Sequence, residues 1–356
     1  MNTNYEIANE SFNISKIKSF LLVMHIGQED AHLIIVGIET NKKYKAILKQ
    51  KLKTNTIHDV SKVINDILEE THRVFNIEIA TTIISAEGTV SNDRSKIIIS
   101  KKIEINKEKL KKETLIKNYV FLNASEATGA ELPFLTKKDL KEINNGDAKS
   151  KIKNTASLKI SATLTASINK YDNKKQTSLP IISNMGKTHI PTETYFDLEL
   201  NNYIRDELLE GKQGPISTEL IVSEKGICLI YDFLISKKVY GEPLLKIKNL
   251  DQQKKAEKII TTKEDTYCVR TTDLFLAYLA RTARELATLT LPYGGLYIEG
   301  KIITLIQNTM KEHFMKEFLN SEIKENLKQI PIYIIEKENV PYRGACDIFL
   351  DQQEDN

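Results

Sequence analysis

The sequence predicts an α/β protein in which mixed β-sheets are flanked by helices and the chain divides into two domains. Its 356 residues exceed the chain length that a single hydrophobic core usually supports. Short β-branched runs alternate with stretches whose apolar residues recur at helical spacing. In the first half the order is three strands, a helix, further strands, a helix and a strand, which is typical of a mixed α/β sheet.

The first half begins with a polar extension over residues 1–18. Three β-branched runs follow at a spacing that predicts an antiparallel meander. Asp59 is placed to cap a helix, because the apolar residues from Val60 to Leu68 fall on one helical face. In chain order the predicted elements are Phe20–Ile26, Leu33–Ile38, Lys43–Leu48, the helix after Asp59, Thr82–Ser85, Lys96–Ser100, the helix Lys107–Leu115 and Tyr119–Leu122.

The second half is mainly helical after a polar segment. Between Gly146 and Pro180, apolar and polar residues alternate in two runs, which predicts a β-hairpin. A stripe of alanines from Ala277 to Ala287 predicts close packing of one helix against its neighbours. The predicted helices are Leu200–Leu209, Ile227–Ile235, Thr272–Leu289 and Ile303–Leu319, and the predicted strands are Leu296–Ile298 and Ile332–Ile335.

Composition and charge exclude several classes of protein. The formal net charge is only +3, from 51 basic and 48 acidic residues, so no basic face for nucleic acid is expected. No apolar run approaches the length of a membrane span or of a signal-peptide core. Cys228, Cys268 and Cys346 are far apart, which argues against a zinc site and fits a reducing cytosol. We therefore expect a cytoplasmic protein with no nucleic-acid partner and no membrane partner.

Three segments resemble the bacterial glucokinases, in the same order along the chain. Glu219-Leu-Ile-Val-Ser-Glu-Lys-Gly-Ile, continuing to Tyr231, is similar to the family pattern E-x-x-L-S-G-x-G-L-x-x-x-Y. Tyr293-Gly-Gly-Leu-Tyr-Ile-Glu-Gly-Lys-Ile resembles the adenosine motif F-G-G-x-x-I-x-G-G-I. Ile330-Pro-Ile-Tyr-Ile-Ile, followed by Gly344, resembles the closing strand and helix start. Together they cover about residues 18–350.

The resemblance implies the two-domain actin-like ATPase fold, which is ribonuclease H-like, with a cleft between the domains. The smaller domain would comprise residues 19–134 and 337–356, and the larger one residues 135–336. The resemblance also implies the family activity, in which a glucokinase transfers the γ-phosphoryl group of ATP to glucose in glycolysis. A fold alone does not determine a function, so the activity is judged from the residues at the family motifs.

Both phosphate-binding hairpins depart from the family pattern. The family's D-x-G-G-T-N-x-R corresponds to His25–His32, where a histidine replaces the metal-holding Asp and Gly27 is the one glycine retained. The second hairpin, G-x-G-T-G-x-G, corresponds to Ser161–Ser167 and has no glycine. A Cβ at such positions blocks the phosphate or forbids the turn, and the carboxylates of Glu29 and Asp30 would repel it. We therefore expect no tightly bound cofactor and no metal, whereas a working kinase would need Mg-ATP.

The catalytic carboxylate of the family is also missing. In the family's N-D-F-x-A segment the Asp takes the proton from the sugar hydroxyl. Here the segment is Asn123-Ala-Ser-Glu-Ala, so Ala124 stands at the Asp position. A methyl group cannot act as a general base, and such a base contributes roughly 100- to 10,000-fold to the rate. In a helix, Glu126 would lie about 200° around the axis and point away. No catalytic residue is predicted.

Several residues keep the identities that the family uses for binding. Asn123 and Glu219 match its sugar-contacting residues, and His189, close to Gly186, is a candidate for a displaced sugar-binding histidine. Asn123 could equally cap a turn, and Glu219 could be a solvated carboxylate. Four glycines of the nucleotide motifs also remain, and each serves either a turn or a nucleotide contact. These glycines are Gly27, Gly294, Gly295 and Gly300.

These departures predict a glucokinase-like pseudoenzyme that acts by binding, as a scaffold or regulator, with glucose as a weak ligand. The alternative is an active glucokinase in which other residues replace the lost ones. A third class, an actin-like assembling protein, has no support beyond the fold. The sequence leaves open the protein partner, a homodimer included, and whether a sugar or a nucleotide binds.

Overall fold

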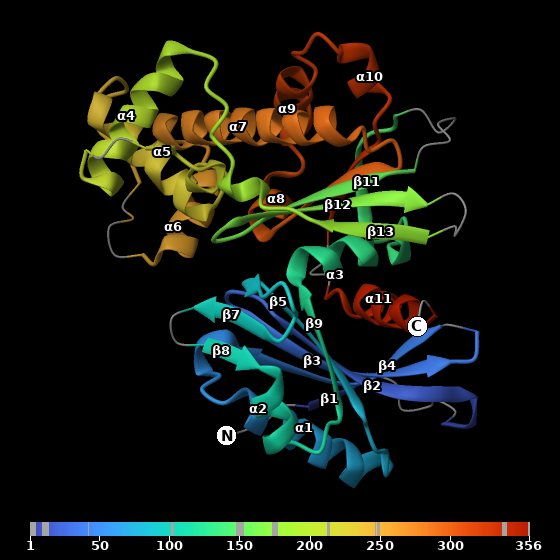
Figure 1. The fold of residues 1–356 in the computed structure, drawn as a ribbon. Coiled ribbons are helices and arrows are strands. Elements are labelled where there is room, and N and C mark those ends of the chain that lie inside the picture. Colours follow the sequence, from blue (N-terminus) through green and yellow to red (C-terminus); the bar gives the residue numbers. More distant parts are fainter. Residues whose placement is uncertain are drawn as a thin grey trace. The chain divides into compact units, whose positions relative to one another are not determined.

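The computed structural model describes residues 5–8, 14–41, 43–100, 103–146, 153–172, 177–211, 214–245, 247, 250–336 and 340–354. The chain forms two compact units (Figure 1). Unit 1 comprises Met1–Leu135 and Asn339–Asn356, and unit 2 comprises Thr136–Glu338. Each unit contains a six-stranded mixed sheet flanked by helices, which confirms the predicted α/β class.

The sheet of unit 1 consists of β1 (Tyr5–Ile7), β2 (Ile17–Ile26), β3 (Asp30–Glu39), β4 (Tyr44–Lys53), β5 (Thr81–Ala86) and β9 (Asn118–Asn123). The strand order is β1-β4-β3-β2-β5-β9. β2, β3 and β4 form the predicted antiparallel meander, whereas β5 runs parallel to β2 and β9 parallel to β5. β1 lies within the predicted polar extension and pairs with β4 as an edge strand. A small antiparallel sheet consists of β6 (Thr89–Val90), β7 (Lys96–Ser100) and β8 (Ile103–Asn106).

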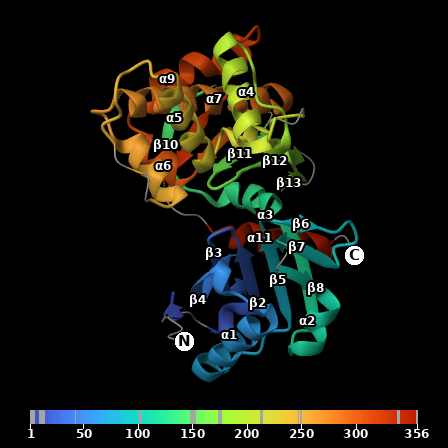
Figure 2. The ribbon, with the colours of Figure 1, turned by 90° about the vertical axis from the view of Figure 1, so that its left-hand side faces the viewer.

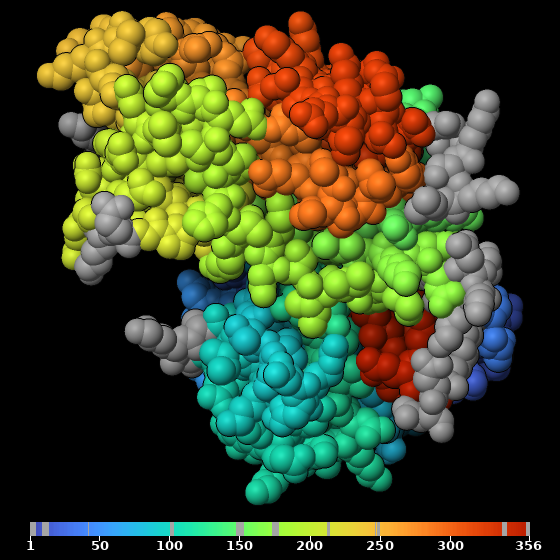
Figure 3. All heavy atoms as spheres, turned by 45° about the horizontal axis from the view of Figure 1, so that its top comes forward, coloured from blue at the N-terminus to red at the C-terminus, as the bar shows by residue number. Residues whose placement is uncertain are grey.

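Helices cover both faces of the large sheet in unit 1 (Figures 1 and 2). α1 (Val60–Phe75) and α2 (Lys107–Glu113) lie on one face, and their apolar side chains share a core with that face. α3 (Ala124–Glu131) and α11 (Tyr342–Glu354) lie on the other face, where Ala345 is fully buried. The red atoms of α11 lie among the atoms of unit 1 in Figure 3, so the end of the chain returns to its first half.

The sheet of unit 2 has the order β10-β15-β14-β11-β12-β13. β11 runs parallel to β14, and β14 runs parallel to β15, while β11, β12 and β13 are successively antiparallel. The β11–β12 pair is the hairpin that the alternating pattern predicts. The strands are β10 (Leu140–Asn144), β11 (Thr155–Ile160), β12 (Leu164–Asp172), β13 (Thr177–Ile182), β14 (Gly295–Glu299) and β15 (Ile332–Ile335).

Seven helices lie in the described part of unit 2. The long α7 is the centre of the layer, because it packs against α5, α6, α9, α10 and β11. Its buried Ala280, Ala283 and Ala287 belong to the predicted alanine stripe. None of the helices in the described ranges is long and apolar enough to cross a membrane. The helices are α4 (Tyr195–Leu209), α5 (Glu224–Lys237), α6 (Gln252–Thr261), α7 (Thr266–Thr290), α8 (Lys301–Ile306), α9 (Met310–Phe318) and α10 (Lys324–Lys328).

The helix predicted after Asp59 is confirmed as α1. Asp59 caps α1, since its carboxylate accepts hydrogen bonds from two backbone amides of the first turn. The single helix predicted over Ile303–Leu319 is wrong. It is two helices, α8 and α9, because the Thr309 amide and hydroxyl both bond the Ile306 carbonyl and close a turn between them. The sequence analysis also missed α6.

Candidate functional site

The carboxyl ends of three parallel strands meet at one edge of the unit 1 sheet. The register places the ends of β2, β5 and β9 side by side. The residues that follow these ends are Gly27, Glu87 and Ala124. In open α/β sheets, ligands bind outside the carboxyl ends of the strands. This edge is therefore the candidate functional surface of unit 1, and the resemblance places the first phosphate hairpin and the catalytic position here.

The turn between β2 and β3 is closed by hydrogen bonds of its own. Gly27 donates its amide to the Asp30 carbonyl oxygen (2.9 Å). The buried Thr54 donates its hydroxyl to the Gly27 carbonyl and its amide to the Glu29 carbonyl, both at 2.8 Å. A Cβ on Gly27 would lie 3.1 Å from the Asp30 carbonyl oxygen, so a glycine suits this tight turn. The one glycine amide of the hairpin is thus already used inside the turn.

Glu87, which the sequence analysis did not select, lies beside this turn. Its Oε1 is 3.8 Å from the position that a Cβ on Gly27 would take. Its amide donates to the Ile26 carbonyl (2.9 Å), which fixes the start of the loop after β5. The available signal was its position two residues after the predicted strand Thr82–Ser85. An anion at Gly27 would meet this carboxylate at a range where like charges repel.

Two lysines of β4 neutralise Asp30, which changes the expectation that Asp30 repels a phosphate. Its carboxylate pairs with Lys51 Nζ at 3.1 Å and with Lys53 Nζ at 2.9 Å. Burial alone would raise the pKa of Asp30, but the hydrogen bonds and charges of the two lysines outweigh it and lower the pKa below its ordinary value. The predicted repulsion of an anion by Asp30 is therefore offset by these two lysines.

The resemblance aligns His25 with the metal-holding Asp of the family. It is only 4% exposed, and its Nδ1 lies 2.8 Å from the Ser85 hydroxyl. His32 faces it in the antiparallel register of β2 and β3. Within the described ranges, no group of three His, Cys, Asp or Glu side chains is arranged to hold a metal ion. Since Mg²⁺ prefers oxygen ligands, a buried imidazole at this position does not suit it.

Asn123 is the N-cap of α3, and both polar atoms of its side chain are engaged. Its Oδ1 accepts from the Ser125 amide (2.9 Å) and the Ser125 hydroxyl (2.7 Å). Its Nδ2 donates to the Gly88 carbonyl (3.1 Å), and its own amide donates to the Glu126 carboxylate (2.8 Å). These bonds form a capping box. The capping role considered from the sequence is thus present, while a sugar contact stays a prediction.

Ala124 is the first residue of α3, and the one carboxylate of that helix turn is fixed elsewhere. Glu126 is buried, and its Oε1 pairs with the Arg94 guanidinium at 2.7 Å. Its Oε2 accepts from the Asn123 amide and from Arg94, which also donates to the Phe121 carbonyl. The carboxylate is therefore turned back to the start of the helix. A Glu in this arrangement is poorly placed to replace the missing base.

The second hairpin of the resemblance, Ser161–Ser167, is the tip of the β11–β12 pair in unit 2. The Ser161 amide donates to the Thr163 carbonyl (2.9 Å), which closes the bend. The Ser161 carbonyl accepts from the Glu224 amide at the start of α5 (3.0 Å). Backbone groups of this tip are therefore bonded to neighbouring backbone, and Leu164 and Ala166 are buried in the core.

The retained glycines of unit 2 have steric roles. A Cβ on Gly300, whose φ is +143°, would lie 2.1 Å from the Ile160 carbonyl oxygen. A Cβ on Gly294 would lie 2.5 Å from the Lys153 carbonyl oxygen. Gly295 has a φ of +132°, where side chains are strained. These close approaches explain all three glycines without a nucleotide, and nucleotide contact by them stays a prediction.

Of the predicted sugar-binding residues, Glu219 and His189 lie on adjacent segments of unit 2, whereas Asn123 belongs to unit 1. Glu219 lies in the 3-10 turn Thr218–Leu220, and the Lys187 ammonium pairs with its carboxylate. His189 forms an isolated antiparallel bridge with Ser217, directly before that turn. A Cβ on Gly186 would lie 3.4 Å from Glu219 Oε2. Lys187 was not selected from the sequence, because only the fold brings it to Glu219.

Comparisons with known proteins identify the family of the chain. The family profile described as Glucokinase matches residues 22–352. The chain belongs to the glucokinase family. A curated glucokinase from Nostoc punctiforme is 33% identical over 150 residues, which is 37% of this chain and 43% of that protein. The alignment thus spans less than half the length of this relative of the glucokinase family.

Solved glucokinases share the fold. The glucokinase from an Antarctic psychrotroph has a TM-score of 0.75 and 18% identity, covering 94% of this chain and 99% of that one. The glucokinase from Balamuthia mandrillaris, solved in complex with glucose, has a TM-score of 0.76 and 16% identity, covering 93% of both chains. These likenesses confirm the predicted actin-like ATPase fold of the glucokinase family.

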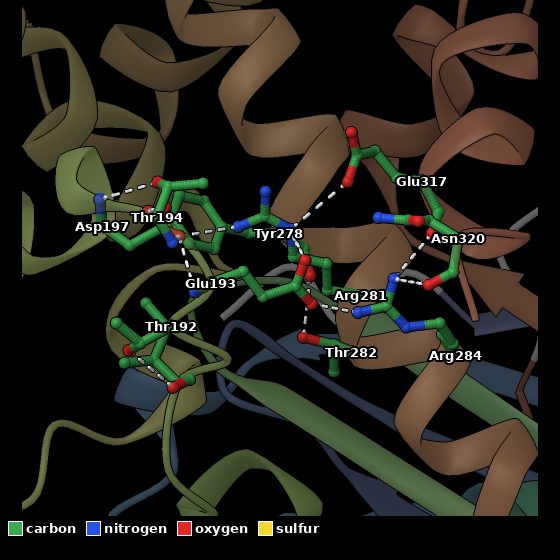
Figure 4. A network of polar contacts seen from close by, with 11 residues as sticks. Thr192, Glu193, Thr194, Asp197, Tyr278, Arg281, Thr282, Arg284, Glu317 and Asn320 are labelled. Atoms are coloured by element: carbon green, nitrogen blue, oxygen red, sulfur yellow. Dashed lines mark hydrogen bonds and ion pairs between the residues drawn. The ribbon is translucent and has the colours of Figure 1, made fainter. Parts of the chain in front are cut away.

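A polar network around Arg281 holds the segment that follows His189 in the chain (Figure 4). Arg281 of α7 pairs with Asp197 at 3.0 Å and with Glu193 and Glu317 at 3.4 Å each. The Tyr278 hydroxyl also donates to Asp197 (2.5 Å), whose other oxygen accepts from two amides at the start of α4. Burial would raise the pKa of Asp197, but these donors outweigh it and lower the pKa. The network therefore fixes the start of α4 on α7.

Proposed function

We propose that this glucokinase-family chain binds a sugar-like ligand and does not transfer the γ-phosphoryl group of ATP. The observation that carries the proposal is the arrangement at Ala124. This residue has no acidic group, and both oxygens of the nearby Glu126 are engaged by Arg94 and by the helix start. Phosphoryl transfer to a sugar hydroxyl needs a carboxylate that accepts its proton.

The surroundings of Gly27 support the same proposal. Its amide donates within the turn, and the Glu87 carboxylate lies beside it. Phosphates are held by backbone amides directed outward and by nearby cations. The residues at this turn do not fit a nucleotide phosphate, and His25 does not fit Mg²⁺. We therefore propose that Mg-ATP does not bind tightly.

The pairing of Glu219 with Lys187, beside His189, supports a retained binding surface in unit 2. Carboxylates, amines and imidazoles are the groups that hydrogen-bond sugar hydroxyls. The Balamuthia relative was solved with glucose, and weak binding of glucose is proposed here on the strength of Glu219. Binding without turnover would suit a scaffold or a regulator.

The second candidate is an active glucokinase that transfers the ATP γ-phosphoryl group to glucose. The family match over residues 22–352 favours it, since the whole catalytic fold is present. It requires a base other than Glu126 and a phosphate site other than the turn at Gly27. Assays of nucleotide binding and of product formation separate the two candidates.

We predict that millimolar Mg-ATP leaves the melting temperature unchanged. A ligand at 100 times its Kd stabilises a protein by about 2.7 kcal/mol, which is readily measured. The chain has no tryptophan, so differential scanning calorimetry is the suitable method. Mg²⁺ alone at the same concentration is the control. A rise that follows the Mg-ATP concentration beyond this control would contradict the reading of the phosphate hairpins.

A further inference from the structure

We infer that the Lys187–Glu219 surface of unit 2 recognises a monosaccharide that carries an anionic group, a carboxylate or a phosphate, in preference to a neutral sugar. Lys187 would receive the anion, and Glu219 would accept a hydrogen bond from a ring hydroxyl. This inference rests on the proposed function, because it takes the surface as a sugar site, and it adds the chemical class of the ligand.

Backbone contacts fix the relative position of the two side chains. Lys187 ends the 3-10 turn Met185–Lys187, and Glu219 lies in the turn Thr218–Leu220. Thr218 ties the two segments together, because its amide donates to the Thr188 carbonyl (2.8 Å) and its hydroxyl to the His189 carbonyl (3.0 Å). The fold thus holds the segments that carry Lys187 and Glu219 next to each other.

The two charges are unequally accessible. The Lys187 side chain is 67% exposed, whereas the Glu219 side chain is 17% exposed. Glu219 Oε2 lies beside Gly186, 3.4 Å from the position that a Cβ there would take. An arriving ligand therefore meets the ammonium first. The exposed imidazole of His189 lies on the segment that pairs with Ser217, next to Glu219.

The chemistry of this pair favours an anionic ligand. A neutral sugar offers only uncharged hydroxyl groups, which can donate to Glu219 or accept from Lys187. An ammonium has three donors, so Lys187 can keep its bond to Glu219 and donate another to a carboxylate or phosphate. Hydrogen bonds between ionised partners are roughly twice as strong as neutral ones. Lys187 therefore makes a stronger bond to a carboxylate or phosphate than to a neutral hydroxyl.

Isothermal titration calorimetry on the full chain tests the inference with four probes: glucose, glucuronate, glucose 6-phosphate and inorganic phosphate. We expect at least one of the two anionic sugars to bind at least about tenfold more tightly than glucose. Lys187→Met should weaken that binding by about tenfold or more, and Glu219→Gln should weaken it as well. Lys237→Met, which breaks the exposed pair of Lys237 with Glu199 in the same unit, is the matched control and should change nothing.

The four probes distinguish a carboxylate ligand from a phosphate ligand. Binding of glucuronate alone identifies a carboxylate, and binding of glucose 6-phosphate alone identifies a phosphate. The inference is overturned if glucose binds as tightly as both anionic sugars, if no sugar binds, if inorganic phosphate matches glucose 6-phosphate, or if Lys187→Met has no effect. Formation of product from glucose and Mg-ATP would refute the proposed function alone, since it does not depend on these affinities.

Discussion

Arg281→Met is expected to lower the free energy of unfolding by about 3–5 kcal/mol. Arg281 is 8% exposed, and its guanidinium is shared by Asp197, Glu193 and Glu317. Methionine fills a similar volume but leaves the buried Asp197 carboxylate without its cation, while Glu193 keeps its ion pair with Arg284. Removing one partner of a buried ion pair is costly, because the remaining charge has lost its compensation. The loss should fall on the transition of unit 2 in urea unfolding followed by far-ultraviolet circular dichroism.

Lys237→Met is the matched control for this prediction as well. Lys237 and Glu199 form an ion pair whose side chains are 39% and 56% exposed, and exposed pairs are worth about 0–1 kcal/mol. A loss below about 1 kcal/mol for Arg281→Met, equal to that of the control, would contradict the structural role given to the network. Tyr278→Phe, which removes one hydrogen bond to Asp197, should fall between the two variants.

A pH dependence of stability is expected from Glu131, at the end of α3. Its side chain is fully buried, with Arg343 Nε at 2.5 Å from Oε1 and the Gly344 amide at 2.7 Å from Oε2. Burial raises the pKa of this carboxyl to about 7, although both α11 groups oppose the shift. Between pH about 4.5 and about 7 the native state therefore holds more protons than the unfolded chain. The contribution of Glu131 to stability is full below this window and is lost as the pH rises through it.

Glu131→Gln isolates this contribution, because glutamine stays neutral at every pH. Relative to the variant, the native chain should lose about 3 kcal/mol between pH 4.5 and pH 8, from 1.36 kcal/mol for each pKa unit. Urea unfolding of both chains at several pH values measures the difference, and the other titrating groups cancel. Parallel curves across this range would mean that the Arg343 pair keeps Glu131 ionised in the native state.

Local patterns predicted much of the fold. The meander, the cap at Asp59 and the β11–β12 hairpin all depend on residues close in sequence, and the structure confirms them. The wrong prediction of one helix over Ile303–Leu319 also came from a local pattern. Its apolar spacing continues through Thr309, whereas the turn is made by hydrogen bonds that spacing does not encode.

The site was less accessible to sequence reasoning. The motifs located Gly27, Ala124 and Glu219, but their partners come from distant parts of the chain. Glu126 is turned by Arg94, 32 residues away, and Lys187 reaches Glu219 across the same separation. Such pairs depend on the packing of elements, which no periodic pattern reports. The expectation about Asp30 failed for this reason, since its lysines lie on another strand.

The absence of phosphoryl transfer is tested most directly by measuring glucose 6-phosphate formed from glucose and Mg-ATP. We predict that the native chain and Ala124→Asp both remain at the level of buffer, because a base acts only on substrates already positioned and the phosphate hairpins are unchanged. An active glucokinase at equal concentration is the positive control. Product that scales with native protein and disappears in Glu219→Ala would contradict the proposal. Product formed only by Ala124→Asp would support the assignment of Ala124 to the position of the catalytic base. It would contradict the proposal that the phosphate hairpins prevent catalysis.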